Sequence, residues 1–272
     1  MVADKVVDIL SDKIEGDILF EKIHFKPFTT LVLKNVTIID RNPAHDVLDA
    51  EAMPVDTFFQ ARYIIANMSL KNLRRHEGLH LDKVSVKDAQ MNLVLEDKDA
   101  RGQEQDDNLS RIFGIRNKEE KVYSEKELFH IRRVGIEDFT FRLKNYTADK
   151  TPYEGGMNWN DLEVSDIFID ANELQFKGGV MTGEAERLSF KEKSGYVCHF
   201  MSGKARVGNG KTIVNNLILK DPWSDIRLPL YMMSYSGIKA FQNYIEEVSM
   251  DAEIGKSAIP FIQRTTCNES ST

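Results

Sequence analysis

Two histidines have the spacing of a metal site, because His76 and His80 lie four residues apart. Histidines at that spacing share one face of a helix and can ligate zinc there. Gly78, followed by the apolar Leu79 and Leu81, instead indicates a turn that leads into a strand. We therefore predict no metal site and no cofactor.

Other stretches imitate ligand-binding motifs, and each lacks a residue that the chemistry needs. Residues 210–212 (Gly-Lys-Thr) end like a phosphate-binding loop, but Ala205 stands where the first glycine of that loop belongs, so a β-turn is expected. Residues 97–102 begin like a calcium loop, but Asn108 replaces the bidentate glutamate. No G-x-S-x-G motif is present. We predict no catalytic residues and no enzymatic activity.

The composition is that of a folded protein without a disulfide framework. The chain has 272 residues, 42% of them hydrophobic, a net charge of −7 and only two cysteines. Cys198 lies in an alternating run and is expected to be a packed strand residue. The acidic balance excludes a general nucleic-acid binder, and no apolar stretch is long enough to span a bilayer.

The periodicity of the chain changes after its first turns. Residues 1–16 have apolar residues at helical spacing and are expected to form an amphipathic helix that caps a sheet. Residues 17–260 mostly alternate apolar and polar, which predicts a continuous antiparallel sheet. A polar excursion at 97–127 is expected to carry a short helix around residues 109–113. Residues 261–272 are expected to form a disordered tail.

Two short helices are also expected outside the excursion. Pro54 is expected to open a helical turn over residues 54–60. Residues 236–248 carry apolar residues at helical spacing.

A weak repeat runs through the strands. Leu33-Lys-Asn-Val36-Thr-Ile38-Ile-Asp40 recurs at residues 81–88 and again at 131–138, with its terminal aspartates 48 and 50 residues apart. Such a repeat favours a β-array that grows by adding similar units, although short apolar and polar alternations also recur by chance in all-β chains.

Strands with one apolar face must bury that face against a second sheet, a helix or a ligand. A compact sandwich uses the apolar faces internally, whereas a curved open sheet leaves a trough suited to acyl chains. Periodicity does not separate these outcomes.

Several segments resemble the AsmA/TamB superfamily. They include residues 18–40, residues 78–89 and, with greater specificity, Trp159-Asn-Asp-Leu-Glu-Val-Ser-Asp166, residues 188–196 and residues 216–226. The later segments are similar to TamB-like proteins of Bacteroides-type bacteria. The resemblance covers nearly the whole chain, and its motifs are strand patterns rather than catalytic signatures.

The resemblance implies a mainly β fold, an elongated and curved antiparallel sheet called a β-taco or groove, with an N-terminal amphipathic helix and a few short helices. It implies an N-terminal piece of a periplasmic envelope protein, held at the inner membrane by an anchor outside this chain. The implied function is phospholipid transport between the inner and outer membranes, outer-membrane protein assembly, or both. The implied partners are phospholipid acyl chains and an outer-membrane assembly protein.

Nine apolar residues are the candidates for the inner face of such a groove. They are Leu93, Leu95, Phe139, Phe141, Leu143, Ile167, Ile169, Leu217 and Leu219. Ordinary sandwich core is the competing interpretation for each. The alternative function is a compact β-sandwich that serves in adhesion or protein binding, and a degenerate glycoside-binding hydrolase is a third.

Overall fold

The computed structural model describes residues 16–26, 29–41, 57–68, 78–95, 107–112, 127–146, 156–236 and 244–259. The expected helix at 1–16 lies outside these residues except for Gly16, which begins a strand, and the expected tail at 261–272 lies outside them entirely. Within the described ranges, no helix combines the length and apolarity needed to cross a membrane.

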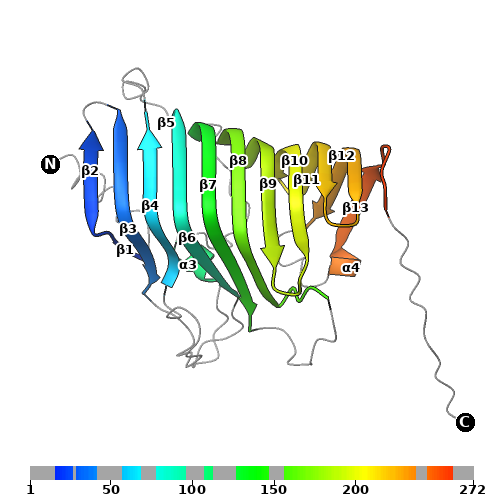
Figure 1. The fold of residues 1–272 in the computed structure, drawn as a ribbon, viewed down its shortest axis with the longest axis horizontal. Coiled ribbons are helices and arrows are strands. Elements are labelled where there is room, and N and C mark those ends of the chain that lie inside the picture. The colour runs from blue at the N-terminus through cyan, green and yellow to red at the C-terminus, as the bar shows by residue number, and fades with distance from the viewer. Residues whose placement is uncertain are drawn as a thin grey trace, which may run out of the picture.

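The described strands form one large curved sheet, shown side by side in Figure 1. They are β1 (Gly16–Leu19), β2 (Lys22–Lys26), β3 (Thr30–Asp40), β4 (Thr57–Asn67), β5 (Leu79–Leu81), β6 (Lys83–Leu95), β7 (Glu127–Asn145), β8 (Asp161–Lys177), β9 (Val180–Glu192), β10 (Val197–Gly208), β11 (Lys211–Lys220), β12 (Asp225–Tyr235) and β13 (Val248–Glu253). The prediction of a mainly β fold is confirmed. No second sheet is found among the described residues, so the sandwich architecture is not observed there.

The strands lie in the sheet largely in chain order. Neighbouring strands are antiparallel except where β5 and β6 pair with β7. β1 and β2 both pair with β3, and the order then runs from β3 through β4, β6 and β7 to β13. β5 and β6 pair with β7 in parallel, which corrects the expectation of a wholly antiparallel sheet. Parallel neighbours need a crossover connection. The polar excursion supplies it, and the short helix expected there is α3 (Asn108–Ile112).

Parts of two expected helices are strands in the structure. Thr57–Asn67 is strand β4, so residues 57–60 are not helical, and Phe58 is buried. Of the expected helix at 236–248, residues 237–243 lie outside the described residues, Tyr244–Glu247 (α4) is helical, and Val248 begins β13. At residues 57–60 and at Val248, ladder pairing with a neighbouring strand overrides the local helical pattern.

Left-handed residues interrupt many of the strands. Asn35, Asp88, Asp138, Asp166 and Asn216 have φ between 49° and 55° and belong to β3, β6, β7, β8 and β11 respectively. Asn and Asp tolerate this conformation better than other residues with a Cβ. Several of these positions coincide with register shifts of the β-bulge type. Bulges bend a strand and increase its local twist.

The bulges also keep the apolar side chains on one face. In β6 the apolar positions Val86 and Ala89 are three residues apart, and in β7 Ile136 and Phe139 have the same spacing. Each pair has matched partners in the parallel register, Val86 with Ile136 and Ala89 with Phe139. The two residues between them, such as Lys87 and Asp88, are polar. The face therefore stays apolar through the bend.

The bulges show which residues of the repeat are structurally equivalent, and these differ from the alignment expected from the sequence. Its second and third copies lie side by side in parallel register, with Val84 opposite Val134. The first copy is shifted, because Leu33 connects through Ile64 to Val86 and not to the level of Leu81. The structural unit is apolar, polar, Asn or Asp, apolar, any residue, apolar. It occurs at residues 33–38, 86–91, 136–141, 164–169 and 214–219.

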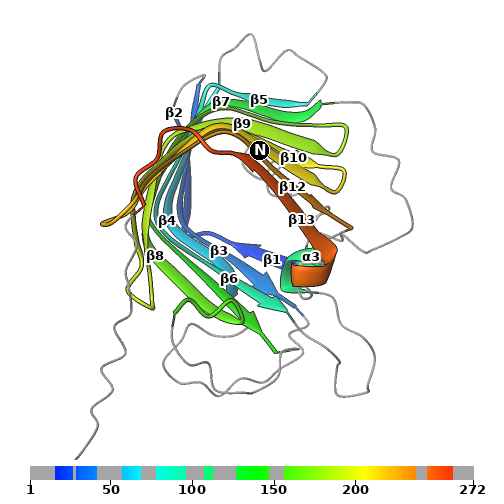
Figure 2. The same ribbon diagram turned by 90° about the vertical axis from the view of Figure 1, so that its right-hand side faces the viewer.

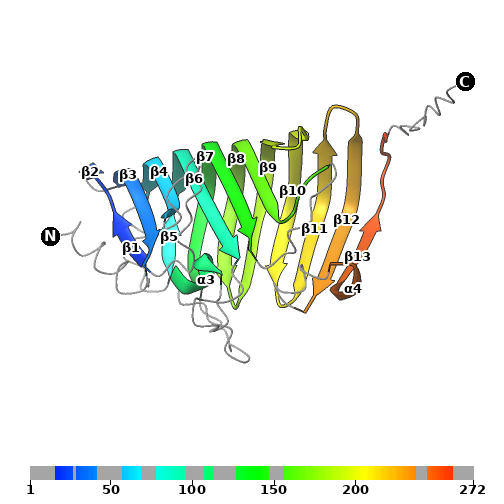
Figure 3. The ribbon, with the colours of Figure 1, turned by 90° about the horizontal axis from the view of Figure 1, so that it is seen from below.

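The bent strands curve the sheet into an unclosed C, which Figure 2 shows end-on and Figure 3 from below. The concave side of this C is called the trough. The inner side of the C is identified by α3, which Figure 2 places inside the open mouth. A Cβ added at Gly16 would lie 3.1 Å from Ile112 of α3. Gly16 and Ile18 are two residues apart in β1, so Ile18 is on the same face as Gly16. The apolar face is therefore concave.

The left-handed conformation predicts opposite outcomes for two substitutions of the exposed Asp138. Asp138→Val places a β-branched side chain at positive φ, so we expect the free energy of unfolding to fall by about 1–2 kcal/mol. Asp138→Gly removes the steric conflict and should lie close to the wild type. Urea unfolding of both variants measures the difference. Equal losses in the two variants would show that the conformation of this bulge is not what matters.

Candidate functional site: the concave apolar face

A continuous row of apolar side chains crosses the concave face along the length of the trough. Each member is the direct register partner of the next. The row is Ile23, Leu33, Ile64, Val86, Ile136, Ile169, Leu188, Met201, Leu219 and Ile226. It runs from β2 to β12. Ten strands at the usual spacing span about 43 Å.

All ten side chains of this row are half-buried rather than buried. Ile136, Ile169 and Leu188 lie in the middle of the sheet, where a packed second layer would bury them completely. Their remaining exposure shows that neighbouring side chains cover them only in part. Among the described residues, no second layer of strands lies over this face.

A second row, beside the bulges, holds several of the buried apolar residues. Val36, Ala61 and Ala89 are register partners with exposed fractions of 4%, 0% and 2%. The row continues through Phe139 to Ile167, which is 8% exposed. Buried apolar residues thus line the positions where these strands bend.

The structure brings all nine residues predicted from the sequence to this face. Leu93 pairs with Leu143, Phe139 with Ile167, and Phe141 with Val164. Ile169 and Leu219 are members of the ten-residue row. Leu217 pairs with Leu228, and Leu95 continues the alternation of β6. Sequence reasoning missed the contributions of β2, β3, β4, β9, β10 and β12, although their apolar alternation was the available signal.

The convex face is polar and carries ion pairs between neighbouring strands. Lys87 Nζ lies 2.5 Å from Glu137 Oε2, and this contact raises the pKa of Lys87. Arg142 Nε lies 2.9 Å from Glu163 Oε2. Charges of this kind are stable in water, so the convex face needs no cover.

Helix α3 lies at the mouth of the C and is held there by polar contacts. Asn108 accepts a hydrogen bond from the Val94 amide at 3.0 Å and donates one to the Asn92 carbonyl at 2.8 Å. Arg111 pairs with the buried Asp40 at 2.7 Å. These bonds attach the crossover to strands β3 and β6.

Cys198 is the buried thiol of the concave face. It is 1% exposed and pairs with Phe190 of β9, as expected for a packed strand residue. Burial raises the pKa of its thiol, which keeps it protonated and unreactive at neutral pH. Burial likewise raises the pKa of the nearby Tyr196.

No protein-family model matches the chain, and no curated protein matches it. The arguments about function therefore depend on the geometry of the two faces.

Thiol labelling tests whether the concave face is open. In a Cys267→Ser background, we expect a cysteine introduced by Ile169→Cys to react with maleimide at least about tenfold faster than Cys198, which is buried and has a raised pKa. Mass spectrometry of peptides over a time course measures both rates. Equal, slow labelling of the two thiols would mean that Ile169 lies in a closed core.

Proposed function

We propose that the concave face binds the acyl chains of phospholipids and that the trough is a path along which they move between membranes. The observation that carries the proposal is the ten-residue row, which is apolar in ten strands between β2 and β12 and half-buried throughout. An acyl chain bound in this trough would cover these side chains, and the acyl chain would itself be removed from water.

The energetics favour such an occupant. Burial of apolar groups contributes about 0.8 kcal/mol per methylene, so a chain of about 14 carbons gains on the order of 10 kcal/mol before entropic costs. A bilayer hydrocarbon core is about 30 Å thick, so one acyl chain spans about 15 Å. The apolar row, at about 43 Å, is long enough for an acyl chain to occupy successive positions along it. An acyl chain that moved along the row would not be exposed to water over its whole length.

The amphipathic division of the sheet fits a path through an aqueous compartment. The convex face carries the ion pairs of Lys87, Arg142 and their partners, whereas the concave face carries the apolar row. The proposed location is the periplasm, with attachment to the inner membrane through a segment outside this chain. These parts of the proposal come from the resemblance to the AsmA/TamB superfamily. Assembly of outer-membrane proteins is the related role that the resemblance also implies.

Leu219 and Ile218 offer a matched pair of substitutions. They are neighbours in β11, both half-buried, and their side chains lie on opposite faces because Leu219 belongs to the apolar row and strand residues alternate. A carboxylate in a hydrocarbon environment costs several kcal/mol. We expect Leu219→Glu to lower phospholipid bound by the purified protein at least about tenfold, and Ile218→Glu to leave it nearly unchanged.

Lipid extraction followed by mass spectrometry measures the bound phospholipid, and transfer of a fluorescent phospholipid between vesicles measures movement. Circular dichroism of both variants controls for folding. Absence of phospholipid from the wild type, together with no transfer activity, would contradict the proposal. Equal losses in the two variants would remove the concave face as the binding surface.

A further inference from the structure

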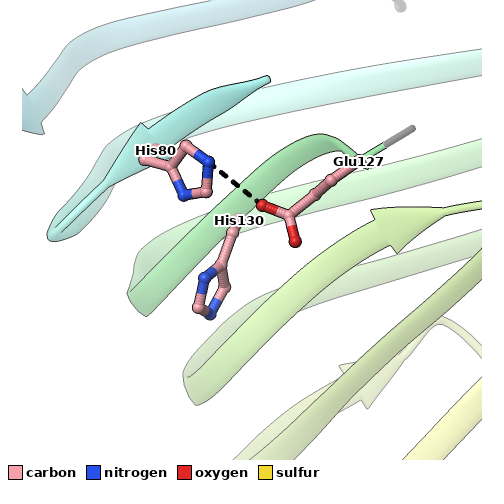
Figure 4. Close-up of side chains that lie close together, drawn as sticks. All are labelled: His80, Glu127 and His130. Atoms are coloured by element: carbon pink, nitrogen blue, oxygen red, sulfur yellow. Dashed lines mark ion pairs between the residues drawn. The ribbon is translucent and has the colours of Figure 1, made fainter. Parts of the chain in front are cut away.

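A cluster of two histidines and a glutamate lies where β5 joins β7 (Figure 4). His80 and His130 are direct register partners in the parallel pairing of these strands. His80 lies between Leu79 and Leu81, which are partners of the apolar residues of β7, so both imidazoles are on the convex face. Fifty residues separate the two histidines in the sequence.

Glu127 completes the cluster because the pairing of β7 with β8 is irregular at its start. The register shifts between Glu127 and Phe129, which places the carboxylate on the face of His130. Glu127 Oε1 lies 3.2 Å from His80 Nε2. One ligand atom from each of the three side chains lies within 4.8 Å of the others.

Two further side chains hold the cluster in place. The Gln175 amide donates a hydrogen bond to Glu127 Oε2. His130 Nε2 lies 2.6 Å from Glu173 Oε2. Carboxylates in this position orient the imidazole of a metal-binding histidine and raise its basicity. Glu173 itself is a left-handed residue of β8, with φ of 52°.

The cluster is shielded from water. The side chains of His80, Glu127 and His130 are 12%, 21% and 29% exposed. Glu127 Oε1 is inaccessible to solvent and forms no hydrogen bond in addition to its ion pair with His80. A shielded carboxylate oxygen without a hydrogen bond is costly unless a positive charge neutralises it. Two imidazoles beside it supply the nitrogen ligands that a transition metal prefers.

We propose that His80, His130 and Glu127 bind one Zn²⁺ ion, independently of lipid binding. Two imidazole nitrogens and one carboxylate form a three-residue zinc donor set, and a water or a fourth side chain completes the coordination. Oxygen-seeking Mg²⁺ and Ca²⁺ are disfavoured by the two nitrogen ligands. The ion attaches the three-residue strand β5 to β7 and so fixes the start of the parallel pair.

Calorimetric titration of chelator-treated protein with ZnCl₂ tests the site. We expect one ion per chain, and at least about tenfold weaker binding in His80→Ala and in Glu127→Gln. The matched control is His199→Ala, which removes an exposed histidine of β10 and should leave the affinity unchanged. Titration with MgCl₂ should show no binding.

Two further readouts keep the test decisive. Co²⁺ substitution should give visible absorption typical of a four-coordinate site with nitrogen and oxygen ligands, and this absorption should be lost in Glu127→Gln. Zn²⁺ should raise the melting temperature of the wild type but not of Glu127→Gln, because the metal binds only the folded site. Absence of stoichiometric Zn²⁺ binding would overturn the proposal. So would binding that a folded Glu127→Gln variant retains at full affinity.

Discussion

The left-handed bulge is the constraint on which the rest of the structure depends. In a long strand with strict alternation, all the apolar side chains would lie on one face and the strand would not bend. Where Asn or Asp adopts positive φ, two polar residues follow each other and the apolar series resumes three positions later. The strand bends, yet the apolar residues on either side of the bulge stay on the concave face. Repetition of this unit in five strands curves the whole sheet.

The open concave face and the polar convex face both follow from that curvature. A flat sheet of this width would need a second layer over its apolar side. The curved sheet covers its bends with small buried residues such as Ala61 and Ala89, and leaves the central row half-buried. The parallel pairing of β6 with β7 then requires a crossover, and Asn108 and Arg111 attach it to β6 and β3. A single architecture thus presents a hydrated outside and an apolar inside.

Much of this was predictable from local patterns, and the remainder depended on long-range pairing. Alternation in β6, β7 and β8 correctly indicated strands, and the nine candidate residues share one face because side-chain direction follows the period of two. The repeat was recognised, but its phase was not, because φ at Asp88 and Asp138 cannot be read from residue types alone. The cluster of His80 with His130 was missed, since register alone brings together residues fifty positions apart.

The central claim is that acyl chains lie against the concave face. Photo-crosslinking with a phospholipid that carries a diazirine at the end of its acyl chain tests it most directly, with adducts located by peptide mass spectrometry. The account predicts adducts on the apolar row, at residues such as Ile136, Ile169 and Leu188, in several successive strands. Adducts confined to the convex face, or an even distribution over both faces, would contradict it.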